Sequence, residues 1–273
     1  MPRACAGFSA LTEGNPIRLL GILGEVSYRE HPVEGTLTRW IECVWTRAGG
    51  ERPDAYDRIV PDGCMDLIWS DRAGVIVVGP NTTAFMAPLQ PGSTSVGVRL
   101  HPGAAPPLFG VPAPMLRDGR TAAREVFGDA GARLEEQVSA AADSSDRARH
   151  LIAFLYGRAR RGGEPDPIVR AAAANLQRVP VADVAEQLAV SERHLRRRVS
   201  EAVGYGPKRL GRVLRLREAL ASLRAGAELA EAAYGSGYAD QAHFTNECRA
   251  LAGVSPGRFL QDLSTVAARP SRP

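Results

Sequence analysis

The segment at residues 157–167, GRARRGGEPDP, constrains the fold of this chain more than any other feature of the sequence. It holds three arginines, three glycines and two prolines, and we expect neither a helix nor a strand to run through such a composition. Strand-like patterns precede this segment, and helix-like patterns follow it. The length of 273 residues suits two domains of ordinary size. We therefore predict an α+β chain with a β-rich domain at residues 1–160, a linker at 161–167 and an all-helical domain at 168–273.

Composition excludes several classes of protein. No apolar run approaches the ~18–20 residues of a membrane span, so we expect no membrane partner. Polar residues interrupt the first 24 positions, which therefore lack the layout of a secretory signal, and we expect a cytoplasmic protein. The four cysteines, at positions 5, 43, 64 and 248, form no C-x-x-C pair and no close cluster. This spacing favours reduced thiols over a zinc site or a disulfide framework, and we expect no metal and no cofactor.

The N-terminal half has the pattern of an antiparallel β domain. Residues 57–100 contain the short apolar runs DRIVPDG, CMDLIWSDRAG, VIVVGP and TSVGVRLHPG, separated by turn residues. The segment at residues 36–47 fits a helical face and a strand face equally well, and both remain open. Apolar spacing over residues 121–156 predicts two helices that close the domain.

Helical periodicity continues throughout the C-terminal half. The predicted helices cover residues 168–178, 180–188, 191–203, 207–224, 228–234, 240–251 and 256–260. Ser191 and Asp240 are good N-caps, whereas Gly204 suits a helix end and Pro207 a first helical turn. A short turn joins the helix at 180–188 to that at 191–203, and another joins 228–234 to 240–251. Each pair has the helix-turn-helix layout, and the connecting helix of ~27 Å approaches the ~34 Å between successive major-groove faces.

Charge is unevenly distributed along the chain. Residues 165–273 hold 16 basic and 11 acidic side chains, a difference of +5, whereas the preceding residues hold 18 and 19, a difference of −1. Every basic residue except Lys208 is an arginine, whose planar donors suit phosphates and guanines. The surplus by itself indicates a polyanion partner, and together with the helix-turn-helix layout we expect this partner to be double-stranded DNA.

The candidate DNA contacts lie on the second helix of each pair. They are Arg193, His194, Arg196 and Arg197 on the first such helix, and Gln241, Thr245, Asn246 and Arg249 on the second. Arginine pairs best with guanine, side-chain amides suit adenine, and threonine suits a phosphate or a thymine methyl group. His194 either bonds a phosphate or packs within the protein. Asp240 and Glu247 bring negative charge to the second helix, so we expect the first to define the sharper half-site.

Four arginines of the connecting helix, at positions 209, 212, 215 and 217, have two interpretations. Two of them contact backbone phosphates, or they form ion pairs within the protein with Glu218 or Glu201.

Aromatic residues of the N-terminal half also have two interpretations. Trp40, Trp45, Tyr56 and Trp69 form either a core or the wall of a small-molecule effector pocket, with Asp66 and Arg99 as its polar anchors. Cys64 resembles a nucleophile, but a catalytic thiol needs a base nearby, and the histidines of this half occupy no recognisable motif. We therefore expect no enzyme activity. The alternative is an enzyme that uses the β-rich domain, with the helical domain as an accessory DNA-binding module.

Residues 180–260 resemble the DNA-binding domain of the AraC/XylS family of transcription regulators. The matching stretches are VADVAEQLAVSERHLRRRV, GYGPKRLGRVLRLREALASL and AELAEAAYGSGYADQAHFTNECRALAGVSPGRFL. In the last stretch, Gly237-Tyr238, Phe244 and residues 253–256 match the family's glycine-aromatic pair, buried aromatic and closing turn. Asn246 occupies an outward position where relatives often carry arginine.

The N-terminal half resembles the β-rich domain attached to some of these regulators, through RIVPDGCMDLIW, VVGP and GVRLHPGAA. The resemblance implies a sequence-specific DNA-binding transcription regulator. A small-molecule effector, RNA polymerase and a second copy of the chain are further candidate partners.

Overall fold

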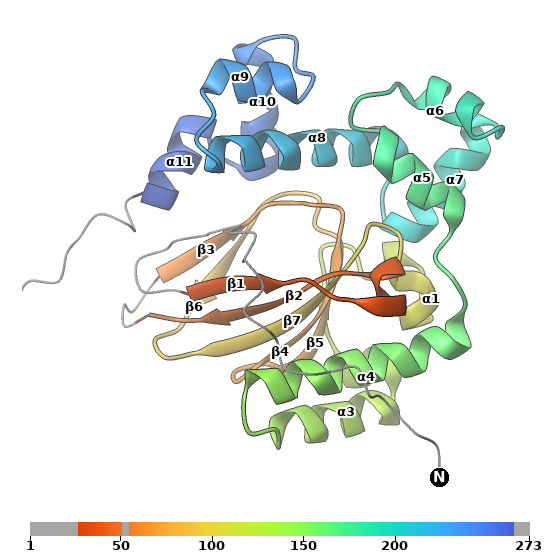
Figure 1. Ribbon diagram of the computed structural model, residues 1–273, viewed down its shortest axis with the longest axis vertical. Helices are drawn as coiled ribbons and strands as arrows, with labels where there is room; N and C mark the ends of the chain where they lie inside the picture. Colours follow the sequence, from red (N-terminus) through yellow and green to blue (C-terminus); the bar gives the residue numbers. More distant parts are fainter. Residues whose placement is uncertain (1–26, 51–54, 265–273) are drawn as a thin grey trace, which may run out of the picture.

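The computed structural model describes residues 27–50 and 55–264, which form a sheet lobe and a helical lobe (Figure 1). Cys5 and the segment tested for an N-terminal signal lie outside the described residues. Within the described ranges, no helix has the length and apolarity needed to cross a membrane.

The sheet lobe contains one antiparallel sheet of six strands and a separate pair of strands. The strands are β1 Ser27–His31, β2 Ile41–Ala48, β3 Ala55–Ile59, β4 Met65–Ser70, β5 Gly74–Val78, β6 Phe85–Leu89, β7 Thr94–Leu100 and β8 Arg120–Ala122. The large sheet has the order β1-β2-β7-β4-β5-β8, and β3 pairs with β6. Alternation along β4 buries Met65, Leu67 and Trp69 and leaves the residues between them half-buried, as the period of a strand requires.

Helices cover the apolar face of this sheet. The lobe contains the 3₁₀ helices Gly35–Arg39 and Ala113–Met115 and the α-helices α1 Ala105–Phe109, α2 Ala123–Phe127, α3 Asp129–Ser139 and α4 Ser144–Gly162. Leu134 and Val138 of α3 and Leu151 and Leu155 of α4 share one apolar core with β4, β5 and β7. The prediction of a β-rich first half is confirmed, and the open segment at 36–47 is a 3₁₀ turn followed by β2.

No helix runs through the whole of residues 157–167, but α4 occupies the first six of these positions. Helix α4 continues to Gly162, so only residues 163–166 lie outside helices. Arginine favours helix, and Arg158 is also held in place because its Nε donates to the carbonyl of Leu108 at 2.6 Å. The helix ends at Gly163, which has a φ of 87°. The next helix then begins at Pro167, capped by the carboxylate of Asp166.

The helical lobe contains seven helices in its described part. They are α5 Pro167–Asn175, α6 Val181–Gln187, α7 Glu192–Val203, α8 Pro207–Arg224, α9 Leu229–Gly235, α10 Gln241–Ala252 and α11 Pro256–Ser264. These helices share a second apolar core, in which Leu195, Leu210, Leu216 and Phe244 are fully buried. Helix α8 runs across the lobe, with α5–α7 at one end and α9–α11 at the other (Figure 1).

The two separate apolar cores predict that residues 165–273 fold without the sheet lobe. Expressed alone, this fragment should lose its helical circular dichroism in one cooperative transition on heating, and it should still bind DNA. A broad, non-cooperative transition would contradict the predicted domain boundary. A folded fragment with no DNA affinity would mean that the affinity depends on residues outside the fragment, either through dimerisation or through the sheet lobe.

Candidate DNA-binding interface

The first helix-turn-helix unit consists of α6 and α7. The Ser191 side chain accepts a hydrogen bond from the backbone N–H of His194 at 3.2 Å, which caps α7 as predicted. Ala189 in the turn has a φ of 52°, which is unusual for a residue with a side chain. Leu195, Val199 and Val203 are buried. The opposite face of α7 therefore points away from the core.

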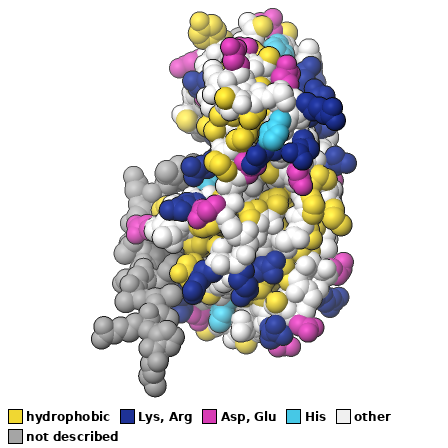
Figure 2. Space-filling model, turned by 90° about the vertical axis from the view of Figure 1, so that its right-hand side faces the viewer, with side chains coloured by type: hydrophobic (Ala, Val, Ile, Leu, Met, Phe, Trp, Pro, Cys, Tyr) yellow, Lys and Arg dark blue, Asp and Glu magenta, His cyan; other side chains and the backbone are white. Residues whose placement is uncertain are grey.

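The residues of α7 predicted to contact DNA differ in whether their side chains already bind other residues of the protein. Arg193, Arg196 and Arg197 are exposed, and no hydrogen bond or ion pair joins them to the described part of the chain. His194 is half-buried, with its Nε2 at 3.4 Å from Nη1 of Arg198. Arg198 in turn binds the carboxylate of Asp166 at 2.6 Å. Figure 2, which faces this side of the molecule, shows basic side chains along one edge of the upper lobe.

The four arginines of α8 for which two interpretations were open all bind within the protein. Arg209 donates to the carbonyl of Thr82 at 3.1 Å, and Arg215 donates to that of Gln177 at 3.0 Å. Arg212 forms two hydrogen bonds with Glu247, and Arg217 pairs with Glu42. All four therefore have partners within the protein, but the expected partners were wrong, since Glu218 pairs with Arg178 instead. The partners lie far away in the sequence and gave no local signal.

The second unit consists of α9 and α10. Asp240 accepts from the backbone N–H of His243 at 2.7 Å, so the predicted cap is present. Phe244 and Cys248 are buried. Among the predicted contacts, Gln241, Asn246 and Arg249 are exposed, and Thr245 is half-buried.

The expectation that Glu247 adds an unscreened negative charge to this surface was wrong. Its side chain is only 12% exposed, and Arg212 of α8 holds both carboxylate oxygens, at 2.7 and 2.9 Å. Such a two-bond pair offsets the charge and also orients it away from the solvent face. Glu247 therefore joins α10 to α8.

The aromatic residues predicted for an effector pocket do not lie together. Trp40 and Trp69 belong to the apolar core of the sheet lobe, and Tyr56 is 52% exposed on β3. Trp45 donates through its indole nitrogen to Asp66 at 3.0 Å. Arg99 lies 3.4 Å from the same carboxylate. The structure thus brings Trp45, Asp66 and Arg99 together in one polar cluster on the face of the sheet opposite the core.

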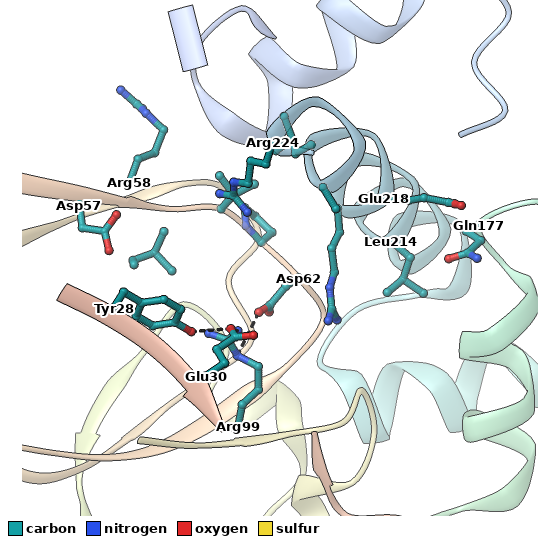
Figure 3. Close-up of a pocket in the computed structure, with 16 residues that line it drawn as sticks. Tyr28, Glu30, Asp57, Arg58, Asp62, Arg99, Gln177, Leu214, Glu218 and Arg224 are labelled. Atoms are coloured by element: carbon teal, nitrogen blue, oxygen red, sulfur yellow. Dashed lines mark hydrogen bonds and ion pairs between the residues drawn. The ribbon is translucent and has the colours of Figure 1, made fainter. Parts of the chain in front are cut away.

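A cavity of about 510 Å³ lies between the two lobes, and Arg99 is the one predicted effector residue on its wall within the described part of the chain. Figure 3 shows Tyr28, Glu30 and Asp62 near Arg99 on the sheet side, with Leu214 and Arg224 on α8 opposite. Arg99 pairs with Glu30 at 3.2 Å and with Asp62 at 3.4 Å. The α8 wall was missed, although Leu214, Arg217, Ala221 and Arg224 recur there at helical spacing.

Cys64 lacks the setting of a nucleophile. It is 3% exposed, and burial, followed by the charge of Asp62, raises the pKa of its thiol well above the ordinary value. Its sulfur lies 3.1 Å from the carboxylate of Glu42, which does not favour a thiolate. Among the described residues no three metal-binding side chains cluster.

Comparison with protein families decides the nature of the helical lobe. A family model described as a helix-turn-helix domain matches residues 184–262, from α6 into α11. These residues are a helix-turn-helix domain of the AraC type. The protein is accordingly a DNA-binding transcription regulator, as the sequence predicts. A second model, described as a domain of unknown function (DUF6597), matches residues 29–122 of the sheet lobe.

Solved structures similar to this chain include other regulators. The C-terminal domain of AraT, a response regulator from Geobacillus stearothermophilus, is 28% identical, with 35% of this chain and 85% of that chain covered and a TM-score of 0.33. A probable AraC family transcriptional regulator from Rhodopseudomonas palustris CGA009 is 25% identical over 38% of this chain and 94% of that chain, with a TM-score of 0.30. ToxT from Vibrio cholerae O395 is 13% identical over 80% of this chain and 98% of that chain, with a TM-score of 0.43. A search among curated proteins gives no match.

The free arginines of the AraC-type domain predict a base-reading role for α7. Replacing Arg196 or Arg197 with alanine should cost ~1–3 kcal/mol at the preferred DNA site and relax the preference at one base position. Binding-site selection with each variant measures this. Arg133→Ala, which removes an exposed arginine of α3 in the sheet lobe, is the matched control. A role limited to phosphate contact would instead weaken binding to all sequences evenly and lower the log–log salt slope by about one unit.

Proposed function

We propose that α7 is the principal base-reading helix of this regulator and that α10 mainly positions the domain on the duplex. Three exposed arginines on α7 without partners in the described chain carry this proposal. Arginine held bidentate to guanine is the commonest specific contact in the major groove. His194, half-buried beside Arg198, suits a phosphate contact at the edge of this surface.

The α10 helix offers fewer strong donors. Gln241, Thr245 and Asn246 carry neutral polar groups, and Arg249 is its single exposed arginine. Asp240 directs its carboxylate at the start of its own helix, where backbone N–H groups offset the charge. Because Arg212 also offsets Glu247, the lower specificity of α10 rests on its few cationic donors rather than on repulsion of DNA.

This difference between the helices predicts an asymmetric binding site. Selection from random DNA should give strong base preferences over one groove segment and weak preferences over the next. Arg197→Ala should reduce affinity for the selected site more than Asn246→Ala does, because a charged bidentate contact is lost. Equal information in both segments, or a larger loss from Asn246→Ala, would refute the ranking.

The cavity between the lobes is the effector site that we propose. A ligand there touches both the sheet lobe and α8, so its binding energy depends on how the lobes are placed relative to each other. Besides the paired Arg58, Arg99 and Arg217, its wall contains Arg224, whose guanidinium lies 4.9 Å from the ring centre of Phe259 and forms no hydrogen bond or ion pair with the described residues. One oxygen of Glu218 on the same wall is buried without a hydrogen-bond partner. A small polar molecule with an anionic group and a hydrogen-bond donor fits both requirements.

Filling the cavity with a large side chain tests whether occupation of the cavity changes DNA affinity, even though the ligand is not identified. Ala221 lies on the α8 wall, and Ala221→Trp places an indole in the cavity. The affinity of the full chain for its selected site should fall about fivefold or more, within the 1–3 kcal/mol usual for coupling between sites. Ala140→Trp, at an exposed position after α3, is the control and should have no effect. Unchanged DNA affinity in a folded Ala221→Trp protein would contradict the proposal.

The remaining partners follow from this role. We propose that the regulator acts in the cytoplasm, where it reaches DNA and RNA polymerase, and that a second copy pairs with it at adjacent sites. The rival proposal of an enzyme in the sheet lobe finds little support at Cys64, because burial raises the pKa of that thiol.

A further inference from the structure

The C-terminal ends of both second helices, α7 and α10, rest on the sheet lobe. The last carbonyls of a helix lack donors from their own helix. At the end of α10, the backbone N–H of Ala84 donates to Leu251 at 2.8 Å, and Nη1 of Arg58 donates to Ala252 at 3.1 Å. At the end of α7, Nη1 of Arg117 donates to the carbonyl of Gly204 at 3.3 Å. Donors from one lobe therefore cap the second helix of both helix-turn-helix units.

One loop of the sheet lobe contacts the ends of both α7 and α10. It covers residues 79–84, between β5 and β6. Pro80 packs so closely under Gly204 that a Cβ atom there would lie 2.7 Å from its ring. Thr82 accepts from Arg209 near the start of α8, and Ala84 donates to the end of α10. Within five residues the loop contacts the end of α7, the start of α8 and the end of α10.

The loop is itself fixed by a neighbouring turn. The carboxylate of Asp118 accepts from the backbone N–H of Thr82 at 2.6 Å and from its hydroxyl at 2.9 and 3.0 Å. The N–H of Asp118 donates back to Pro80 at 3.2 Å. Asp118 has a φ of 56°, an uncommon backbone conformation that such contacts must maintain. These bonds make the loop a rigid support rather than a flexible connection.

Helix α8 alone would hold the two units less firmly relative to each other than α8 and the sheet lobe do together. They lie at opposite ends of α8, and short turns containing glycines with positive φ, Gly204 at 89° and Gly226 at 96°, connect them to it (Figure 1). Each unit packs on its own end of α8, and the two units make no extensive contact with each other in the described chain, so a slight bend of α8 changes their relative position. Anchoring both units to the sheet lobe removes this freedom before DNA binds, which lowers the entropic cost of binding.

We propose that the sheet lobe sets the separation of the two DNA segments that the protein accepts. Arg58, Arg117 and the loop at residues 79–84 are the positioning residues, and none of them needs to touch DNA. This inference rests on the proposed reading of successive groove segments by α7 and α10. Arg58 also lines the cavity between the lobes, so a ligand that contacts Arg58 acts on the support of α10.

Changing the separation of the two selected segments tests the inference. One added or removed base pair moves the second segment by about 3.4 Å and about 34° around the duplex. The full chain should lose about tenfold or more in affinity on such a change, a cost in the range of a mismatched base pair. In the double variant Arg58→Gln, Arg117→Gln, the loss should shrink to about threefold or less. The base preferences within each segment should remain as in the original protein.

Two further measurements keep the outcomes distinct. Arg133→Gln, with an exposed arginine on α3, is the matched control and should keep the original spacing preference. If thermal unfolding shows that the double variant does not fold, Thr82→Val loosens the loop by removing the hydroxyl bonds to Asp118. A folded variant that keeps the full spacing preference overturns this inference alone. An original protein without base preference in either segment overturns the proposed reading of DNA as well.

Discussion

The burial of α8 on nearly every side is the constraint on which the rest of the structure depends. Nine of its 18 residues are buried, and they include Leu210, Val213, Leu216, Leu220 and Leu223. A short helix-turn-helix unit cannot bury its own apolar face, so each unit completes its core against one end of α8. Two of its other side chains, Arg209 and Arg217, bind Thr82 and Glu42 of the sheet lobe. The same helix thus holds the DNA-binding domain together and joins it to the sheet lobe.

Because α8 binds other parts of the protein through its arginines, the net positive charge of the C-terminal half is a weaker indication of DNA binding than it first suggests. In the described part of this half, most arginines bind other residues of the chain; for example, Arg198 joins α7 to Asp166, and Arg212 joins α8 to Glu247. An arginine committed to such a pair would have to break it to reach a phosphate. Arg193, Arg196 and Arg197 of α7 are exposed without such a pair, so the net surplus of the domain says less about DNA binding than the partners of each arginine do.

The two faces of the large sheet have different roles. One face builds the apolar core with α3 and α4, and the other presents a polar cluster that includes Asp66 and Arg99. Burial raises the pKa of Asp66, whereas the charge of Arg99 opposes that change. The edge toward the helical lobe adds the donors that cap α7 and α10. A cavity, a charged network and two helix ends therefore meet at one interface.

The sequence by itself determined the local structure of the helical lobe, because caps and turns depend on neighbouring residues. Ser191, Asp240 and Pro207 mark helix starts at the predicted positions, and the spacing of buried residues gave both helix-turn-helix units. Only the tertiary structure decided which polar groups are free. Glu247 looked exposed, yet Arg212, 35 residues away, holds it, and Arg217 finds Glu42 across 175 residues. The support of α7 and α10 by Arg117, Arg58 and Ala84 also joins distant residues. Such pairs have no periodicity or spacing in the sequence, since folding alone brings their partners together.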